Sequence, residues 1–252
     1  MKSLQFRSGH AGRFRCAAAA LIGAAALAAA PAAGAAETSG SAGPYTVYLG
    51  LAYLQTHSSS PDLSGLNTPA GLNLDVGNAS TLGLGIVRNV APAWSVELAL
   101  GVPPRVRTDA KGANWAAAGV APGTGIVDVH LISPTVFANY HPLGVDSRID
   151  PYIGIGVNYT RFTDVTALNS LNSSIGQTQV HLSSSWGAAA HVGVVYHIDR
   201  RWSLVGSIAI ADVQSDMTST TYVPGTSIVT MQGKTHINFH PVVYTAAIGY
   251  SF

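Results

Sequence analysis

The feature that most constrains this sequence is a two-residue period that runs through its last stretch, residues 242–252. One face of this stretch is apolar or aromatic and holds Val242, Tyr244, Ala246, Ile248, Tyr250 and Phe252. Smaller residues such as Gly249 and Ser251 alternate with them. A period of two predicts a β-strand, because successive side chains of a strand point to opposite faces. One face of this strand is therefore expected to meet an apolar medium and the other a narrow interior.

Residues 1–35 are predicted to be a signal peptide. Its basic residues are Lys2, Arg7, Arg13 and Arg15. The apolar stretch 16–30 follows, and Ala-Gly-Ala at 33–35 fits a signal-peptidase site. The apolar stretch is too short for a comfortable membrane span, and an uncleaved anchor helix is the competing interpretation. Residues 36–252 are expected to form a single domain.

Loss of the signal peptide changes the charge balance of the chain. The full sequence has 13 Lys and Arg against 12 Asp and Glu, so removal of four basic residues leaves nine. A chain with this balance gives no reason to expect a nucleic-acid partner. The single cysteine, Cys16, lies within the signal peptide. The mature chain therefore has no thiol for disulfide, metal or redox chemistry, and we expect no cofactor.

Eight segments alternate in this way, the C-terminal one included. They are 45–55, 81–87, 94–101, 129–140, 152–160, 185–196, 202–211 and 242–252. A tilted β-strand needs only about 9–11 residues to cross a bilayer. The second face of these segments is mostly Gly, Ala, Ser and Thr and carries few charges. That composition favours a membrane barrel over a soluble β-sandwich or lipocalin-like barrel, whose outer face would be polar.

The connections between the segments alternate in length. Three are short: 88–93, 142–150 and 198–201. Four are long and rich in Gly, Ser, Thr, Asn and Pro: 56–79, 102–127, 163–181 and 213–235. Outer-membrane barrels have short periplasmic turns and long external loops. The sequence thus predicts an all-β fold, an eight-stranded antiparallel up-and-down transmembrane β-barrel with four long external loops, in the bacterial outer membrane.

Several blocks of the sequence resemble the outer membrane protein W (OmpW) family, which includes the alkane-import proteins of hydrocarbon-degrading bacteria. The blocks are RIDPYIGIGVNYTRF at 148–162, SWGAA at 185–189, VGV at 192–194, DRRW at 199–202, SPT at 133–135 and VEL at 96–98 with Pro103. They occur in family order along the whole mature chain. The resemblance implies a channel that passes small hydrophobic molecules through the barrel and releases them sideways into the bilayer. The Ala/Gly-rich stretch 112–125 departs from the family pattern.

The inward faces indicate an apolar bore. An eight-stranded barrel is barely wider than its own side chains, and most inward positions here are small. Glu97 is the only carboxylate expected in mid-strand, with no basic residue beside it. Candidate lumen-lining residues are Ala99, Phe137, Ala189 and Ala209. In the alternative, the glycines and alanines merely ease the curvature of the sheet while loops plug the lumen.

Function classes other than a channel have less support in the sequence. His181 and Ser183 share one strand face, as a base and a nucleophile would, but no carboxylate lies near in sequence. His191 and His197 are too far apart to bind one metal ion. A lipid-modifying barrel enzyme is thus disfavoured, and we expect no enzymatic activity. A structural or surface-recognition protein that acts through its external loops remains the main alternative.

The expected partners follow from the membrane location. They are outer-membrane lipid, lipopolysaccharide, the outer-membrane assembly machinery and small hydrophobic solutes. Arg105, Arg107 and Lys111 form a basic run that could contact lipopolysaccharide phosphates, although a solvated loop explains the run equally well. Phe252 is predicted to act as an assembly signal.

Overall fold

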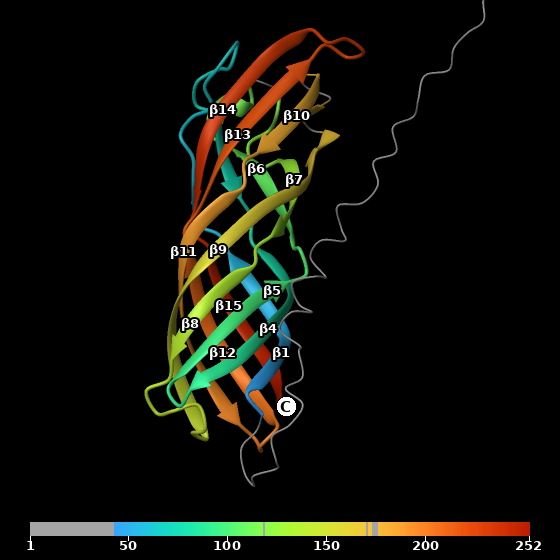
Figure 1. Cartoon of the computed structure of the whole chain (residues 1–252). Coiled ribbons are helices and arrows are strands. Elements are labelled where there is room, and N and C mark those ends of the chain that lie inside the picture. The colour runs from blue at the N-terminus through green and yellow to red at the C-terminus, as the bar shows by residue number, and fades with distance from the viewer. Residues whose placement is uncertain (1–42, 118, 170, 173–175) are drawn as a thin grey trace, which may run out of the picture. The chain divides into compact units, whose positions relative to one another are not determined.

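Eight antiparallel strands close into a barrel (Figure 1). They are β1 (Tyr45–Gln55), β4 (Ala79–Ala91), β5 (Trp94–Gly101), β8 (Thr135–Tyr140), β9 (Ile149–Ala167), β11 (Ser185–His197), β12 (Trp202–Ala211) and β15 (Val242–Ser251). Each strand pairs with the next one along the chain, and β15 pairs back onto β1. The predicted eight-stranded barrel is confirmed.

This computed structural model describes residues 43–252 apart from 118, 170 and 173–175. The predicted signal peptide, 1–35, lies outside the described residues. Within the described ranges, no helix has the length and apolar character needed to cross a bilayer.

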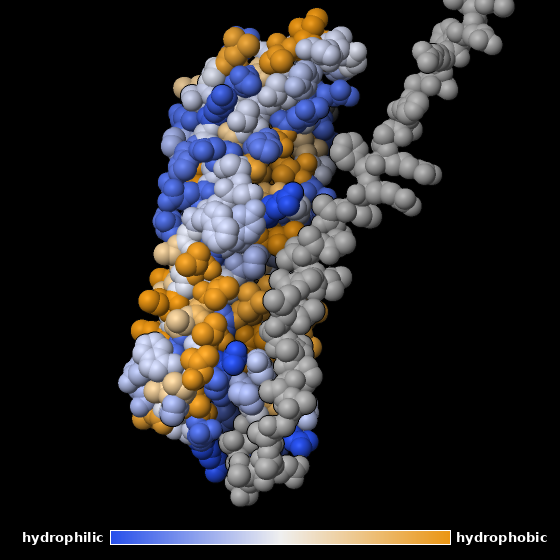
Figure 2. Space-filling view, in the orientation of Figure 1, coloured by the Kyte–Doolittle hydropathy of each residue, from blue (hydrophilic) through white to orange (hydrophobic). Residues whose placement is uncertain are grey.

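Alternation decides which side chains of the barrel meet lipid. On β9, Ile153, Ile155 and Val157 are exposed, whereas Tyr152 and Asn158 are buried. Figure 2 shows the consequence on one face of the molecule, a band of hydrophobic residues across the barrel and a more hydrophilic surface beyond it. Such a band matches the hydrocarbon layer of a membrane.

The interior phase of β8 also agrees with the sequence prediction. Val136 and Tyr140 are exposed, whereas Phe137 and Asn139 are buried. The crossing expected over 129–140 is interrupted, however, at Ser133-Pro134. Residues before the break form β7 (Gly125–Ile132), which belongs to the part of the fold beyond the membrane.

The four long connections, predicted as external loops, contain strands of their own, which the sequence did not predict. They contain β2 (Ser58–Ser59), β3 (Asn73–Val76), β6 (Arg105–Lys111), the short 3-10 helix η1 (Ala113–Trp115), β7, β10 (Gln177–Leu182), β13 (Val213–Tyr222) and β14 (Val229–Phe239). The strand order β9-β7-β6-β3 continues the barrel sheet, and β10-β13-β14-β2 forms a second sheet. Together these strands, with the upper part of β9, extend the barrel at its upper end in Figure 1. We call this region the outer extension.

The outer extension has a hydrophobic core of its own. Leu72, Val106 and Ile126 are almost completely buried there, together with Trp115. The indole nitrogen of Trp115 donates a hydrogen bond to the carbonyl of Asn73, at 2.9 Å. An apolar interior therefore continues beyond the hydrophobic band, inside walls whose outer face is polar.

The opposite end carries the chain terminus and tight turns (Figure 1). Phe252 stacks on Tyr45 with ring centroids 6.3 Å apart, within an aromatic girdle at this end. In the turn between β11 and β12, the carboxylate of Asp199 accepts backbone hydrogen bonds from Arg201 and Trp202. These two donors lower the pKa of Asp199 below its ordinary value. Short turns and an even strand number place this end in the periplasm.

Candidate functional site

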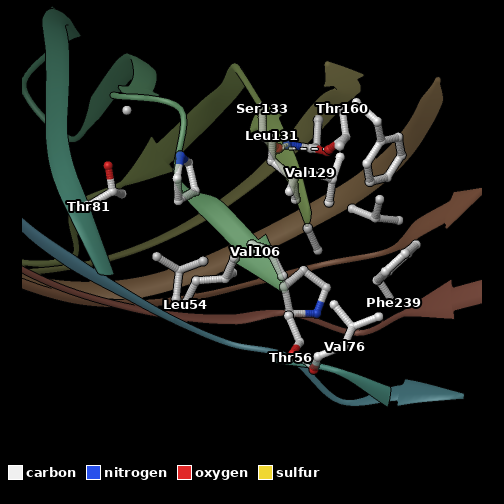
Figure 3. A pocket seen from close by; sticks show the side chains of 18 of the residues that line it. Leu54, Thr56, Val76, Thr81, Val106, Val129, Leu131, Ser133, Thr160 and Phe239 are labelled. Carbon is white, nitrogen blue, oxygen red and sulfur yellow. Dashed lines mark hydrogen bonds between the residues drawn. The ribbon is translucent and has the colours of Figure 1, made fainter. Parts of the chain in front are cut away.

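A cavity of about 250 Å³ lies inside the barrel and the outer extension. Figure 3 shows Leu54, Val106, Val129 and Phe239 among the side chains that line it. Its upper walls share many residues with the hydrophobic core of the outer extension. Many polar groups on these walls already form hydrogen bonds within the protein, as in the 2.8 Å contact between the hydroxyls of Ser133 and Thr160. The space therefore suits an apolar molecule.

The structure places all four candidate lumen-lining residues against this cavity. Ala99 lies on β5, Phe137 on β8, Ala189 on β11 and Ala209 on β12. Strands β5 and β12 are four places apart in the ring of eight, so Ala99 and Ala209 lie on opposite walls. A bulky side chain at these two positions would narrow the cavity from both sides.

A chain of polar side chains crosses the barrel at the lower end of the cavity. The Nε2 atom of His191 lies 2.7 Å from Oδ1 of Asn139, and Nδ2 of Asn139 donates to Oε2 of Glu97 at 3.0 Å. Because an amide oxygen only accepts, Nε2 of His191 carries the hydrogen in this arrangement. The His191 ring also stacks on Phe137, with centroids 3.8 Å apart. We call His191, Asn139, Glu97 and Phe137, together with Tyr48 and Tyr152, the lumen floor.

A second polar group lies below the lumen floor. Nδ1 of His141 is 2.7 Å from Oδ2 of Asp150, and its Nε2 is 2.8 Å from Oγ of Ser95. This order of serine, histidine and aspartate is the one used by many hydrolases. Ser95 is only 1% exposed, however, and none of the three lines the cavity. A substrate has no access to the hydroxyl, so these three residues form a buried structural network.

Glycines on the inward faces make room for the lumen floor. A β-carbon at Gly154 would overlap Asn139 and His191, and one at Gly249 would overlap the ring of Tyr48. Glycine is required at these positions because a large side chain of a neighbouring strand packs directly over them. The expectation that small inward residues leave a continuous hollow bore is therefore wrong in the lower part of the barrel.

Asp150 is a second carboxylate buried inside the barrel, at the end of a crossing and outside the mid-strand region in which only Glu97 was expected. Asp150 was assigned to a turn, but β9 begins at Ile149 and buries Asp150 at its second position. The alternation of side chains along the strand could have revealed this position. Asp150 is two residues before the inward Tyr152, and residues two apart on a strand face the same side. His141 follows the outward Tyr140 and is inward by the same rule.

The barrel wall is interrupted between β5 and β8. Pairing between these strands ends where Ala99 opposes Thr135. It resumes only where the amide of Leu131 donates to the carbonyl of Pro104, at 3.2 Å. In the described part of the chain, no backbone hydrogen bond links residues 100–103 to the facing strand.

Each side of this interruption bonds to its other neighbour instead. The amide of Val102 donates to Leu82 on β4 at 2.9 Å, and that of Tyr159 on β9 donates to Pro134 at 3.0 Å. Prolines at 103, 104 and 134 contribute no N–H group, which weakens pairing here. The cavity borders this gap, since Leu100, Gly101, Pro104, Leu131 and Ser133 all line it.

The other residues singled out in the sequence do not form a second site. His181 is exposed at the end of β10, and the hydroxyl of Ser183 accepts a hydrogen bond from the amide of Asp216. The guanidinium groups of Arg105 and Arg107 both pair with Asp128. Among the described residues, no cluster of three or more His, Cys, Asp or Glu could hold a metal ion.

Comparison with known proteins places the chain. A sequence model described as the OmpW family matches residues 41–252. This chain belongs to the OmpW family. The resemblance seen in the sequence blocks is therefore confirmed, and with it the bacterial outer membrane as the location. The OmpW family is made of outer-membrane barrel proteins and not of enzymes, so the chain is assigned no enzymatic activity.

Individual relatives agree with the OmpW assignment. Outer membrane protein W of Salmonella typhimurium is 32% identical over 213 residues, which cover 84% of this chain and 86% of that protein. The dibenzothiophene metabolism operon protein PahQ of Pseudomonas aeruginosa is 25% identical, covering 83% and 89% of the two chains. The crystal structure of OprG from Pseudomonas aeruginosa superposes with a TM-score of 0.72 at 25% identity, covering 86% and 99%.

Proposed function

We propose that this chain is an outer-membrane channel for small hydrophobic molecules. A solute enters the cavity from the outer extension and leaves sideways through the gap between β5 and β8. The observation that carries the proposal is an apolar cavity that ends on a polar lumen floor and borders an interruption in the barrel wall.

The lumen floor supports sideways release over passage straight through the barrel. An apolar molecule that continued downward would have to separate Asn139 from Glu97 and His191. Breaking buried hydrogen bonds without replacing them is costly. Movement into the hydrocarbon layer keeps an apolar solute in apolar surroundings throughout.

The family supports the class of solute. PahQ is named for an operon of dibenzothiophene metabolism, and dibenzothiophene is an apolar aromatic molecule. The cavity described here offers such molecules few hydrogen-bonding groups. A sugar of similar size would lose its hydration without finding replacement partners.

Tryptophan at both Ala99 and Ala209 is expected to lower uptake of an apolar solute by about tenfold, because two indole rings fill a lumen barely wider than its side chains. Uptake is measured in liposomes that contain the purified barrel, with an apolar dye-labelled or radioactive solute and a sugar. Backbone pairing is untouched, so folding should persist.

Tryptophan at Ala138 and Ala188 is the matched control, because both residues point outward on β8 and β11. This pair adds the same volume to the lipid-facing wall and should leave uptake unchanged. If the folded Ala99/Ala209 variant imports the apolar solute at the original rate, the cavity is not the route. Surface recognition through the outer extension would then be the better explanation.

We also propose that Phe252 is an assembly signal. Its amide donates to the carbonyl of Tyr45 at 3.0 Å, so it helps to close β15 onto β1. Deletion of Phe252 should reduce the amount of folded barrel in the outer membrane and leave unfolded protein in the periplasm. The measurement is the heat-modifiable band on a gel of membrane fractions. A normal band after deletion would refute the proposal, and substitution with tyrosine should preserve the band.

A further inference from the structure

The lumen floor carries a hydrogen-bond acceptor that faces the apolar cavity. From it we infer that the preferred solutes are amphiphiles with an apolar body and one terminal hydrogen-bond donor, such as a primary alcohol. The donor would bind Oε1 of Glu97 while the apolar body fills the cavity above. This inference rests on the proposed channel function and adds the chemistry of one end of the solute.

Glu97 is placed at the point where the cavity ends. It lies on β5 opposite Phe137 of β8, two residues below Ala99, and it lines the cavity together with Tyr48 and Tyr152. Its Oε1 atom lies over Gly85 of β4, 3.6 Å from where a β-carbon would be. An ionisable residue within a membrane-spanning segment is costly to keep and usually has a functional partner.

Only one oxygen of this carboxyl group is occupied by the protein. Oε2 accepts the hydrogen bond from Asn139, whose own orientation is fixed by His191. Among the described residues, no hydrogen bond reaches Oε1. The floor thus holds Glu97 in a fixed position with a single acceptor directed toward the cavity.

The upper walls of the cavity offer the donor of a solute fewer acceptors than the lumen floor does. Its upper walls are formed by side chains such as Leu54, Val106 and Phe239 (Figure 3). The hydroxyls of Ser133 and Thr160 there already bond to each other. A hydrogen bond to a charged group contributes more in proteins than one between neutral groups. A solute that satisfies Oε1 should therefore be retained over one that only fills the space.

The test compares three linear solutes with equal numbers of non-hydrogen atoms: a primary octanol, heptyl methyl ether and nonane. Only the alcohol donates a hydrogen bond. Uptake into liposomes that contain the barrel is measured for each and corrected with empty liposomes. We expect a preference for the alcohol over the ether of about tenfold, as one hydrogen bond to a carboxylate provides. Glu97→Leu should abolish that preference while the ether is still taken up.

Two further variants make the test specific. Glu97→Gln retains an acceptor oxygen without the charge, so it should give an intermediate preference. Thr245→Val removes a polar group from another wall of the cavity and should leave the ratio of alcohol to ether uptake as it is in the unmodified protein. Folding of each variant is verified by heat-modifiable mobility.

The outcomes separate the inference from the proposed function. Equal uptake of alcohol and ether by the unmodified protein would overturn the inference alone, and so would a preference that survives Glu97→Leu in the folded barrel. If none of the three solutes enters faster than in empty liposomes, the channel function itself fails.

Discussion

Replacement of His141 by leucine is expected to lower the free energy of unfolding by about 3–5 kcal/mol, the usual effect of leaving a buried charged group without its partner. The side chains of His141 and Asp150 are only 6% and 3% exposed, and 2.7 Å separates Nδ1 from Oδ2. Without the imidazole, the carboxylate of Asp150 stays buried with no donor at that oxygen. Urea-induced unfolding of the barrel in lipid vesicles measures the change.

The chain contains a matched control for this prediction. His236 and Asp216 on the outer extension are also 2.7 Å apart, but their side chains are 46% and 78% exposed. Replacement of His236 by leucine should cost less than about 1 kcal/mol, since water replaces the lost partner. Similar losses at the two histidines would show that the pair below the lumen floor is not shielded from water.

Arginine in place of Ile155 should cost about 2–4 kcal/mol, as expected for a cation on the lipid face near the bilayer midplane. Ile155 lies on β9 and is 72% exposed. Arginine in place of Leu143, in the turn between β8 and β9, is the control, because Leu143 is 63% exposed but lies outside the crossing strands. The loss there should be under about 1 kcal/mol.

The exposed fractions of Ile155 and Leu143 in the isolated protein are nearly equal. The two positions therefore differ in what they face, which is lipid at Ile155 and water at Leu143. Refolding into bilayers followed by urea titration gives both values. If the two arginine variants lose the same stability, the hydrophobic band of Figure 2 does not lie in a membrane.

The membrane part of the fold was readable from the sequence because lipid imposes a simple pattern. Every crossing must present apolar residues outward, so all eight strands were located, although some are longer than expected and β8 is shorter. The segment predicted over 152–160, for example, lies within β9, which extends from Ile149 to Ala167. Its extra residues lie beyond the stretch that shows the lipid-facing pattern.

The strands of the outer extension were missed because their polar side chains face outward and their apolar side chains face inward, the reverse of the membrane strands. On β6, Val106, Thr108 and Ala110 point inward while Arg107 and Lys111 point to solvent. That alternation is the pattern of a soluble sheet, and a search for apolar outward faces does not detect it. β13 is harder still, because buried positions such as Ser215, Ser219 and Thr221 are polar like the exposed ones.

The candidate site was predictable in part. Strand parity alone puts Ala99, Phe137, Ala189 and Ala209 on the inward side, where the structure has them. The lumen floor depends instead on contacts between strands that are remote in sequence, such as the bond from His191 to Asn139. Parity gives the direction of each side chain, but not the partner that it meets across the barrel.

An inward glycine that faces a large side chain from the next strand sets the height at which the lumen of the barrel is closed. The height of this closure depends on where the glycine and its large partner occur along the strands. It can therefore differ between barrels that have the same number of strands. Moving the glycine and its partner by two residues would shift the closure by about 7 Å along the strand. Barrels with the same wall could therefore hold solutes of different lengths, and a few paired substitutions would convert one length preference into another.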